Sequence, residues 1–451
     1  MKRYEKHKDS RVEWLGLIPE HWHALKLKFI GDAMIGVTYT PEDLVNENEG
    51  ILVLRSSNIQ NGKLSLEDNV YINKSINEKL FVQLNDILLC SRNGSRDLIG
   101  KNILIDERSI GMTFGAFMTV YRTEYSQFLY YFFNSQIFSA QSSLFLSSTI
   151  NQLTLGVLRD MFVALPPQEE QEKIVSFLNY QTSVIDDLIS KKEKLIEKLK
   201  EKRQAVINEA VTKGLDPNAK MKDSGIEWLG KIPENWRLLR VKYLLADTEN
   251  ALKTGPFGSE LKSSEMTENG YYSIYTQRNV LDNEFTFFKD YVDDKKAATL
   301  KGFEVRDNDI LITTRGTIGK AALVPEGSTK GYLHPCLIAL RLNEELVLPS
   351  WTLTYMNESS YFLRNVLFES NSTTIEVIYG GTLRNVLIPI PPISEQRQIL
   401  EFVENKLSNY KALEIKISSQ LVALKEYRQS LISEAVTGKI DVRGWEPPGK
   451  N

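Results

Sequence analysis

Apolar residues recur at every seventh position along two long segments, 168–212 and 393–437, and neither segment contains proline or glycine. In the second segment the steps of seven fall on Val403, Tyr410, Ile417, Leu424 and Leu431. In the first they fall on Leu178, Ile185, Lys192, Leu199 and Val206, so one step is polar. A seven-residue apolar repeat is typical of a coiled coil. We therefore expect two helices of about 45 residues, roughly 65 Å long, that pair with each other in antiparallel orientation.

Both predicted helices have start and stop signals. A proline pair precedes each helix: Pro166-Pro167 and Pro391-Pro392. Acidic residues fall in the first turns, where they suit the helix dipole: Glu169, Glu170 and Glu395. Gly214 and Gly438 follow the last turns and are predicted to end the helices.

Short β-type runs punctuated by Gly, Asn and Asp fill the regions 24–165 and 238–390. In the first region they are GILVLRSSNI (50–59), NDILLCSR (85–92) and KNILIDE (101–107); in the second, YYSIYTQRNV (271–280), NDILITTR (308–315) and KAALVPE (320–326). Helical stretches follow at 126–138 and 349–368. Each region is predicted to be an α/β or α+β body of roughly 140 residues, a usual size for one domain.

The sequence contains two copies of one series of motifs. EWLGLIPEHW (13–22) returns as EWLGKIPENW (227–236), and we call these two stretches the repeated decapeptides. Residues 148–171 align with 373–396, and residues 199–212 align with 424–437. Between these anchors the two copies diverge, so they are expected to share a scaffold and to differ in what the variable part does. The proline in each decapeptide disfavours helix before it, and the aromatics are expected to pin the segment to the body.

Composition narrows the class of protein. The 451 residues are 42% hydrophobic and 25% charged, which is ordinary for a globular protein with two or more domains. No apolar run reaches the length of a membrane span, and the N-terminus has no signal-peptide pattern. The two cysteines, Cys90 and Cys336, fit a reducing cytoplasm. A formal charge of −3 argues mildly against a stand-alone DNA binder but leaves room for local basic patches.

Several catalytic chemistries lack their motifs. RGTIGKA (315–321) resembles a phosphate loop, but Thr314 and Ala321 break the pattern, so we expect no nucleotide hydrolysis. Four histidines and two cysteines without a tight cluster make a zinc site improbable. The proline pairs precede Gln and Ile, unlike the motif of amino-methyltransferases, and no glycine-rich cofactor turn is evident.

Two polar loops recur in both copies. Loop A is LRSSNIQNGK (54–63) and YTQRNVLDNE (275–284); loop B is NDILLCSRNGSRDLIGK (85–101) and NDILITTRGTIGK (308–320), with four extra residues in copy one. Arg, Asn and Gln form paired hydrogen bonds to guanine and adenine, and Gly beside Arg favours a flexible loop with free N–H groups. The loops are therefore either DNA contacts or ordinary hairpin connections. The basic run 191–203 is more typical of a solvated coiled-coil face than of a nucleic-acid patch.

With this doubled plan, the chain resembles the specificity subunit of type I restriction–modification enzymes. The resemblance rests on the decapeptides, NDIL…RG-TIGK, LPPQEEQEKI and IPPISEQRQIL at the helix starts, and the two helix ends around EAVT. It covers almost the whole chain. It implies target-recognition domains at 1–167 and 215–392, spacer helices at 168–214 and 393–437, and a tail at 438–451, arranged with pseudo-twofold symmetry around the antiparallel coiled coil.

The resemblance also implies a function. The chain would be a non-catalytic, cytoplasmic subunit that reads a split, asymmetric site on double-stranded DNA. Two methyltransferase subunits would methylate adenine N6 with S-adenosylmethionine, and motor–nuclease subunits would cut with ATP and Mg, so this chain would bind no cofactor. The expected DNA contacts are Arg55, Asn58, Arg92, Asn93, Arg96, Lys101, Arg278, Asn279, Arg315, Thr317 and Lys320.

Two other functions compete with this one. A coiled-coil scaffold with two divergent binding domains would have no DNA role. An autonomous nuclease or methyltransferase is disfavoured by the missing motifs.

Overall fold

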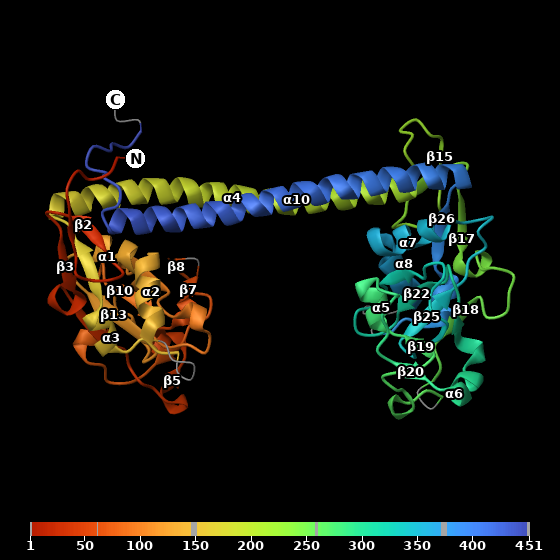
Figure 1. The fold of residues 1–451 in the computed structure, drawn as a ribbon, viewed down its shortest axis with the longest axis horizontal. Coiled ribbons are helices and arrows are strands. Elements are labelled where there is room, and N and C mark those ends of the chain that lie inside the picture. The colour runs from red at the N-terminus through yellow and green to blue at the C-terminus, as the bar shows by residue number, and fades with distance from the viewer. Residues whose placement is uncertain (1, 61, 146–150, 258–259, 371–376, 449–451) are drawn as a thin grey trace. The chain divides into compact units, whose positions relative to one another are not determined.

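The computed structural model describes residues 2–60, 62–145, 151–257, 260–370 and 377–448. The aligned stretches 148–171 and 373–396 begin at residues outside this description, and the tail 438–451 ends outside it. The chain divides into two compact units: unit 1 holds residues 1–193 and 418–451, and unit 2 holds residues 194–417 (Figure 1). Each unit contains one mixed body and parts of both long helices.

The long helices are α4 (Gln168–Lys213) and α10 (Ile393–Val436). None of the residues at the predicted seven-residue spacing is exposed. The one polar residue among them, Lys192, donates from Nζ to Gln420 Oε1 at 2.6 Å. In unit 1, Asp186 pairs with Arg428 and Glu193 pairs with Lys425. Residue numbers thus rise along α4 as they fall along α10.

In unit 2, Lys200 pairs with Glu414, so the helices run in opposite directions there as well. The predicted antiparallel coiled coil is confirmed. Within the basic run, Lys192 and Lys200 bond to residues of α10, and Arg203 pairs with Glu358 at the end of α7 (Pro349–Glu358). Over the described residues, no helix combines the length and the apolar character needed to cross a membrane.

The body of unit 1 contains two four-stranded sheets. The first is antiparallel, in the order β11 (Asn102–Leu104), β10 (Ile87–Cys90), β13 (Met118–Arg122) and β4 (Asp32–Ile35). The second has the order β12 (Thr113–Phe114), β6 (Ile51–Leu54), β9 (Tyr71–Ile72) and β5 (Leu44–Val45), with β12 parallel to β6. Three pairs complete the body: β1 (His7–Asp9) with β2 (Leu17–Pro19), β3 (His23–Lys26) with β14 (Phe162–Leu165), and β7 (Ile59–Gln60) with β8 (Lys63–Leu64).

Among the described residues, the body of unit 2 repeats this plan except for the outer strand of the second sheet and the pair β7 with β8. Its first sheet has the order β23 (Ala321–Leu323), β22 (Ile310–Thr313), β25 (Leu337–Leu340) and β18 (Leu252–Thr254). Its second sheet has the order β20 (Tyr291–Val292), β19 (Tyr272–Tyr275), β24 (Gly331–Leu333) and β21 (Glu304–Val305), with β19 parallel to β24. The pairs β15 (Met221–Asp223) with β16 (Lys231–Pro233), and β17 (Arg237–Arg240) with β26 (Leu387–Ile390), match those of unit 1. The predicted mixed tandem-repeat fold is confirmed.

Helices cover the sheets, and here the structure corrects two details. The stretch 126–138 forms α1 (Ser126–Phe133) and the start of α2 (Gln136–Phe145), and 349–368 forms α7 (Pro349–Glu358) and most of α8 (Tyr361–Ser370). The predicted strand 271–280 ends early, because residues 277–282 form α5 (Gln277–Asp282). The remaining short helices are α3 (Leu155–Asp160), α6 (Asp294–Thr299) and α9 (Gly380–Asn385).

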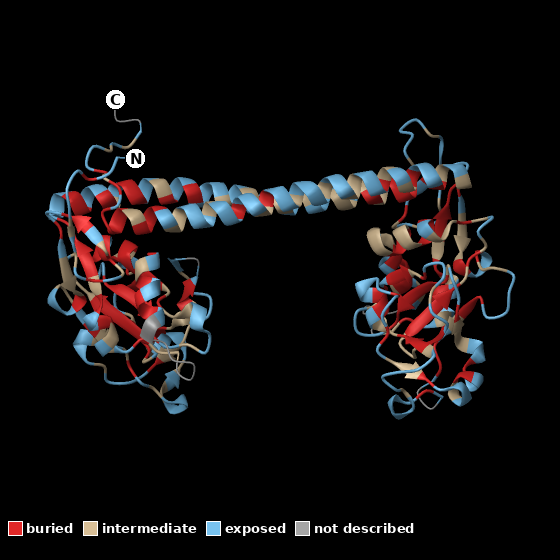
Figure 2. Ribbon diagram, in the orientation of Figure 1, coloured by how far each residue is buried: buried red, intermediate tan, exposed pale blue. Residues whose placement is uncertain are grey.

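The core of each body includes the end of the other repeat's helix. In unit 1, Ile432 and Val436 from α10 belong to the same buried cluster as Trp22 of the first decapeptide. Figure 2 shows the buried residues of both bodies and of the helix ends in red. In unit 2, Ile207 and Val211 from α4 cluster with Trp236 of the second decapeptide. The aromatics therefore pin each decapeptide both to its body and to a helix from the other copy.

A left-handed glycine completes each of these junctions. Gly438 follows α10 with φ of +70°, and a Cβ there would collide with the ring of Pro19. Gly214 follows α4 with φ of +78°, and a Cβ there would lie 3.0 Å from the Glu395 carboxylate and 3.4 Å from the Trp236 ring. Only glycine adopts this conformation readily and leaves room for the decapeptide.

The helix-start glutamates close the junctions from the other side. Glu395 accepts hydrogen bonds from Trp236 Nε1 at 2.9 Å and from Asn235 Nδ2 at 3.2 Å. Glu170 bonds to the Tyr4 hydroxyl, and one of its oxygens lies 2.7 Å from His21 Nε2. These carboxylates were predicted to suit the helix dipole, and they also hold the decapeptides.

We predict that Gly438→Ala destabilises unit 1 by at least about 2 kcal/mol. A left-handed alanine costs about 1–2 kcal/mol, and the added methyl group must displace Pro19. Urea unfolding of the full chain, with amide exchange in the last turn of α10, measures the loss. The control is Gly444→Ala, because a Cβ at Gly444 meets no atom within 4 Å. Equal stability of the two variants would contradict the role of this junction.

Candidate nucleic-acid interface

Loops A and B meet in unit 1. Asn93 Nδ2 of loop B donates to Ser56 Oγ of loop A at 3.2 Å, and Lys101 Nζ donates to the Ser56 carbonyl at 3.4 Å. The two loops lie next to each other because β6 and β10 deliver them from the two sheets of one body. A pair of loops that the sequence predicted separately therefore forms one surface.

The same loops meet in unit 2. Gln277 Nε2 of loop A donates to the Thr317 carbonyl of loop B at 3.5 Å. Here loop A is the short helix α5 rather than the 3-10 turn that unit 1 forms at Ser56–Asn58. The two units thus present the same pair of loops with different local shapes.

A buried ion pair anchors each loop B and explains the repeated Asn-Asp at its start. Asp86 binds Arg122 through both carboxylate oxygens, at 2.8 and 2.7 Å, and Asp309 binds Arg341 at 2.9 and 2.8 Å. The Asn before each Asp is left-handed, with φ of 66° at Asn85 and 64° at Asn308. Bidentate pairs fix geometry well, so each loop B leaves its strand in a defined direction.

Loop B is tight, which corrects the expectation of a flexible loop with free N–H groups. The Gly319 amide donates to the Thr313 carbonyl, and the Gly100 amide donates to the Cys90 carbonyl, both at 2.9 Å. A Cβ on Gly319 would lie 2.6 Å from Leu363, and one on Gly100 would lie 2.8 Å from Phe138. These glycines allow close packing on the helices behind the loop.

Two of the predicted contacts are corrected by their burial. Asn58 is 0% exposed; it accepts from the Arg55 amide at 2.9 Å and donates to the Ser65 carbonyl at 3.0 Å. Asn279 is 6% exposed and makes equivalent bonds to the Thr276 amide and the Glu284 carbonyl. Both side chains hold loop A together, and neither faces solvent to meet a base.

Other predicted contacts are partly engaged within their own unit. Arg55 pairs with Asp68 at 2.9 Å, and Arg278 pairs with Asp282 at 3.2 Å. Arg96 is exposed, and its guanidinium donates to the Ser143 carbonyl at 3.2 Å near the end of α2. Asn93 and Lys101 join the loops, as described above.

Five predicted residues are exposed on loop B: Arg92 and Arg96 in unit 1 and Arg315, Thr317 and Lys320 in unit 2. In unit 2, the loop segment 313–320 carries two cations and no acidic residue. In unit 1, segment 91–101 carries three cations and one acid, Asp97. A cationic, exposed loop is the feature that a phosphate backbone or a guanine edge attracts.

Two titratable side chains next to the loops, Cys90 and His334, favour their neutral forms. Burial raises the pKa of the Cys90 thiol, which lies at the end of β10, and burial lowers the pKa of the His334 imidazole, which lies next to loop A of unit 2. The charge of each surface is therefore set by its arginines and lysines. Within the described part of the chain, no group of three or more His, Cys, Asp or Glu side chains is placed to hold a metal ion.

Three residues that the sequence did not single out belong to this surface. Ser56 and Gln277 join the loops. Phe117 lies between β12 and β13, is 57% exposed, and has Arg92 over its ring. Phe117 is in neither loop, so no repeated motif marks it. It lies in the turn between β12 and β13, and only the structure shows that this turn brings it beside Arg92.

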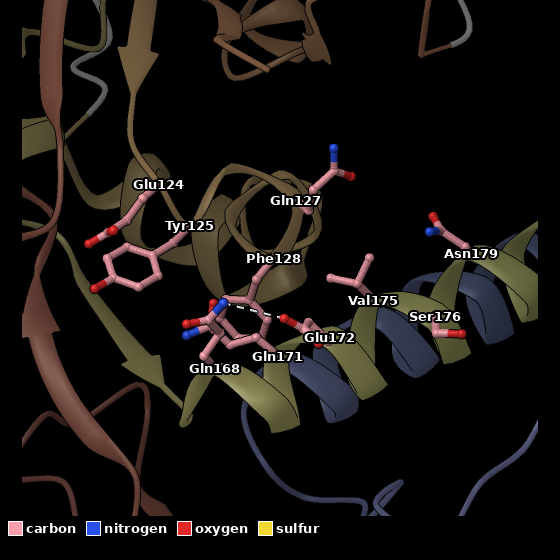
Figure 3. Close-up of a pocket in the computed structure, with 10 residues that line it drawn as sticks. All are labelled: Glu124, Tyr125, Gln127, Phe128, Gln168, Gln171, Glu172, Val175, Ser176 and Asn179. Atoms are coloured by element: carbon pink, nitrogen blue, oxygen red, sulfur yellow. Dashed lines mark hydrogen bonds between the residues drawn. The ribbon is translucent and has the colours of Figure 1, made fainter. Parts of the chain in front are cut away.

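A cavity of about 520 Å³ lies elsewhere in unit 1, between α1 and the first turns of α4 (Figure 3). Figure 3 shows Gln168 donating to Glu172 at 3.3 Å on its α4 side. None of its lining residues belongs to loop A or loop B: Glu124, Tyr125, Gln127, Phe128, Gln168, Gln171, Glu172, Val175, Ser176 and Asn179. We therefore leave it out of the nucleic-acid interface.

Fold and site together define a class: a doubled protein in which one scaffold presents two similar but distinct cationic loop surfaces. Comparison with known proteins gives the family. Residues 19–198 and 257–422 match the sequence model of the type I restriction modification DNA specificity domain. The chain belongs to this family. It is a specificity subunit of a type I restriction–modification system, and its role is recognition of a DNA sequence.

Individual relatives agree with the family. The chain is 25% identical to the type I restriction enzyme EcoKI specificity subunit of Escherichia coli K12, over 94% of this chain and 90% of the relative. It is 24% identical to the StySPI specificity subunit of Salmonella potsdam, with the same coverage. The scaffold alternative without a DNA role is not favoured.

Solved structures share the fold. A chain from a study of complex assembly and conformational transition of the type I R-M system superposes with a TM-score of 0.69 at 17% identity, covering 94% of this chain and 99% of that one. The HsdS subunit of Thermoanaerobacter tengcongensis superposes with a TM-score of 0.54 at 16% identity, covering 94% and 98%.

We predict that Asn58→Ala lowers the free energy of unfolding of unit 1 by about 1–3 kcal/mol, because buried groups of loop A lose their partner. The recognised DNA sequence should not change. Urea unfolding measures the first effect, and a methylation map of the host genome measures the second. Asn48→Ala, at an exposed asparagine of the same unit, is the control and should leave stability within about 0.5 kcal/mol. A changed DNA motif with unchanged stability would restore Asn58 as a base contact.

Proposed function

We propose that this chain is the non-catalytic reader of a type I complex in the cytoplasm, and that each unit reads one half of a split site on double-stranded DNA. Loop B of each unit would supply the base contacts through Arg92 in unit 1 and Arg315 in unit 2. The remaining exposed or half-exposed cations of the two surfaces would contact phosphates. Phosphate contacts position a protein on DNA, whereas base contacts select the sequence.

One observation carries this proposal: loops A and B converge in both units on the same backbone plan. Ser91 donates through its amide and its hydroxyl to the Phe117 carbonyl, just before β13, and Thr314 donates in the same way to the Cys336 carbonyl, just before β25. Arg92 and Arg315 follow these residues and are both exposed. A scaffold repeated this closely would present two equivalent arginines to two halves of one target.

The half-sites should differ in sequence. Unit 1 has four extra residues in loop B and a 3-10 turn in loop A, whereas unit 2 has the helix α5. Because the side chains around the two arginines also differ, the bases that fit them should differ. We therefore propose an asymmetric bipartite target with an unread gap.

The chemistry would belong to partner subunits. We propose that two methyltransferase subunits dock beside the bodies and helices and methylate adenine N6 with S-adenosylmethionine. Motor–nuclease subunits would use ATP and Mg to cut unmodified DNA. This chain would then hold none of these cofactors, in keeping with the absence of their motifs from its sequence. Its formal charge of −3 is compatible with partner subunits that supply part of the contacts to the DNA phosphates.

An adenine-methylation map of the host genome, with and without this gene, tests the proposal. The expected result is one split motif, two short half-sites with a fixed gap, that loses its N6-methyl mark on deletion. Complementation with the gene should restore it. Identical maps in a strain that expresses the chain together with a methyltransferase subunit would overturn the proposal.

We predict that Arg315→Ala relaxes one position in one half-site and costs about 1–3 kcal/mol in binding to the complete target. Lys320→Ala should instead weaken binding to all DNA sequences and lower the salt dependence, because a lysine on a phosphate carries no sequence information. Binding by the complex with its methyltransferase subunits, over a series of salt concentrations and single-base variants, separates the two effects. A uniform loss with Arg315→Ala would make Arg315 a phosphate contact.

A further inference from the structure

The backbone of unit 1 holds Phe117 rigidly in the middle of the loop surface. The Phe117 carbonyl accepts three hydrogen bonds from loop B: from the amides of Ser91 and Arg92, both at 3.0 Å, and from the Ser91 hydroxyl at 3.1 Å. The residue that follows is the buried first residue of β13. Phe117 as a whole is 57% exposed. A large apolar ring is therefore fixed in position and turned toward solvent among cationic residues.

The ring lies against the arginine that we assign to base reading. The Arg92 guanidinium carbon lies 5.0 Å from the centre of the Phe117 ring. Such a cation–π contact restricts the arginine without using any of its N–H donors. Arg92 and Phe117 thus form a preorganised pair in which the N–H donors of the arginine lie beside the apolar surface of the phenylalanine.

Unit 2 lacks this ring. The equivalent position is Cys336, whose carbonyl accepts from the Thr314 amide at 3.0 Å and from the Thr314 hydroxyl at 2.9 Å. The backbone anchor is thus the same, but the side chain is small and half-buried. The aromatic contact is a difference between the two reading surfaces and not a part of the shared scaffold.

The major groove offers a match for this pair. Guanine presents two acceptors that suit the arginine fork, and thymine presents a C5 methyl group that suits an apolar side chain such as phenylalanine. We propose that Phe117 contacts the methyl group of a thymine adjacent to a guanine that Arg92 binds, in the half-site read by unit 1. This inference rests on the proposed function and adds the base step that unit 1 selects.

A wedge between base pairs is the other role for an exposed aromatic ring on DNA. An inserted side chain places its faces against the bases above and below it. The guanidinium of Arg92 already lies over the Phe117 ring. Contact with a methyl group needs only the exposed part of the ring, so the geometry favours it over insertion.

The test uses the complex of the full chain with its methyltransferase subunits and the target found by the methylation map. The half-site of unit 2 is the one that Arg315→Ala relaxes, so the other belongs to unit 1. Each thymine of the unit 1 half-site is replaced in turn by deoxyuridine, which removes only the C5 methyl group. With the native chain, one replacement next to a guanine should weaken binding about 4-fold, because burying one methyl group changes a binding constant by about that factor.

The variant Phe117→Ala should bind the native target at least about 4-fold more weakly. Its affinity should no longer fall when thymine is replaced by deoxyuridine. Phe117→Leu keeps an apolar contact and should retain part of the response. Phe29→Ala is the matched control: Phe29 is 71% exposed in the same unit and has Lys28 over its ring, but it lies outside both loops. That variant should respond to deoxyuridine as the native chain does.

The inference is overturned if the native complex ignores every deoxyuridine replacement, or if Phe117→Ala keeps the response. If the native complex shows no methyl dependence while Phe117→Ala still binds more weakly, the ring acts as a wedge and the inference is likewise overturned. In each of these cases the complex still selects its split target, so the proposed function survives. Loss of sequence preference in the native complex would instead count against the proposed function itself.

Discussion

The structure depends on a contact between each decapeptide and the helix end of the other repeat. Trp22 and Trp236 are fully buried where the left-handed glycines Gly438 and Gly214 end the helices. Because the two contacts are reciprocal, neither copy of the sequence completes its own body. Each unit draws its core from both halves of the chain, and this explains why the decapeptide is the most closely repeated part of the sequence.

That arrangement separates the scaffold, which both units share, from the loops, which differ between them. The helix seam, the decapeptides and the buried Asp–Arg pairs are the same in both units, and they fix where loops A and B emerge. The loops themselves are free to differ because they lie at the surface. A protein built in this way keeps its assembly constant while its two reading surfaces take on different sequence preferences.

The loops achieve their placement through packing rather than flexibility. Gly100 and Gly319 bring loop B close against the helices behind it, and Asn58 and Asn279 hold loop A from within. Side chains that would suit a base chemically are thus used to fix the backbone. A rigid surface loses less conformational entropy on binding DNA, so the buried asparagines contribute to recognition indirectly.

The sequence by itself determined the doubled plan, because the motifs recur in the same order. It also determined the two helices and their antiparallel pairing, because the seven-residue repeat shows their periodicity and the proline and glycine signals mark where they begin and end. It also located the two loops, because both recur. Only the tertiary structure decided which loop residues are exposed: Asn58 and Arg92 carry equally suitable side chains, and the difference between them is burial. Likewise, no repeated motif includes Phe117, and only the structure places it beside Arg92. Its outward direction follows from contacts between segments far apart in the chain, which no local pattern records.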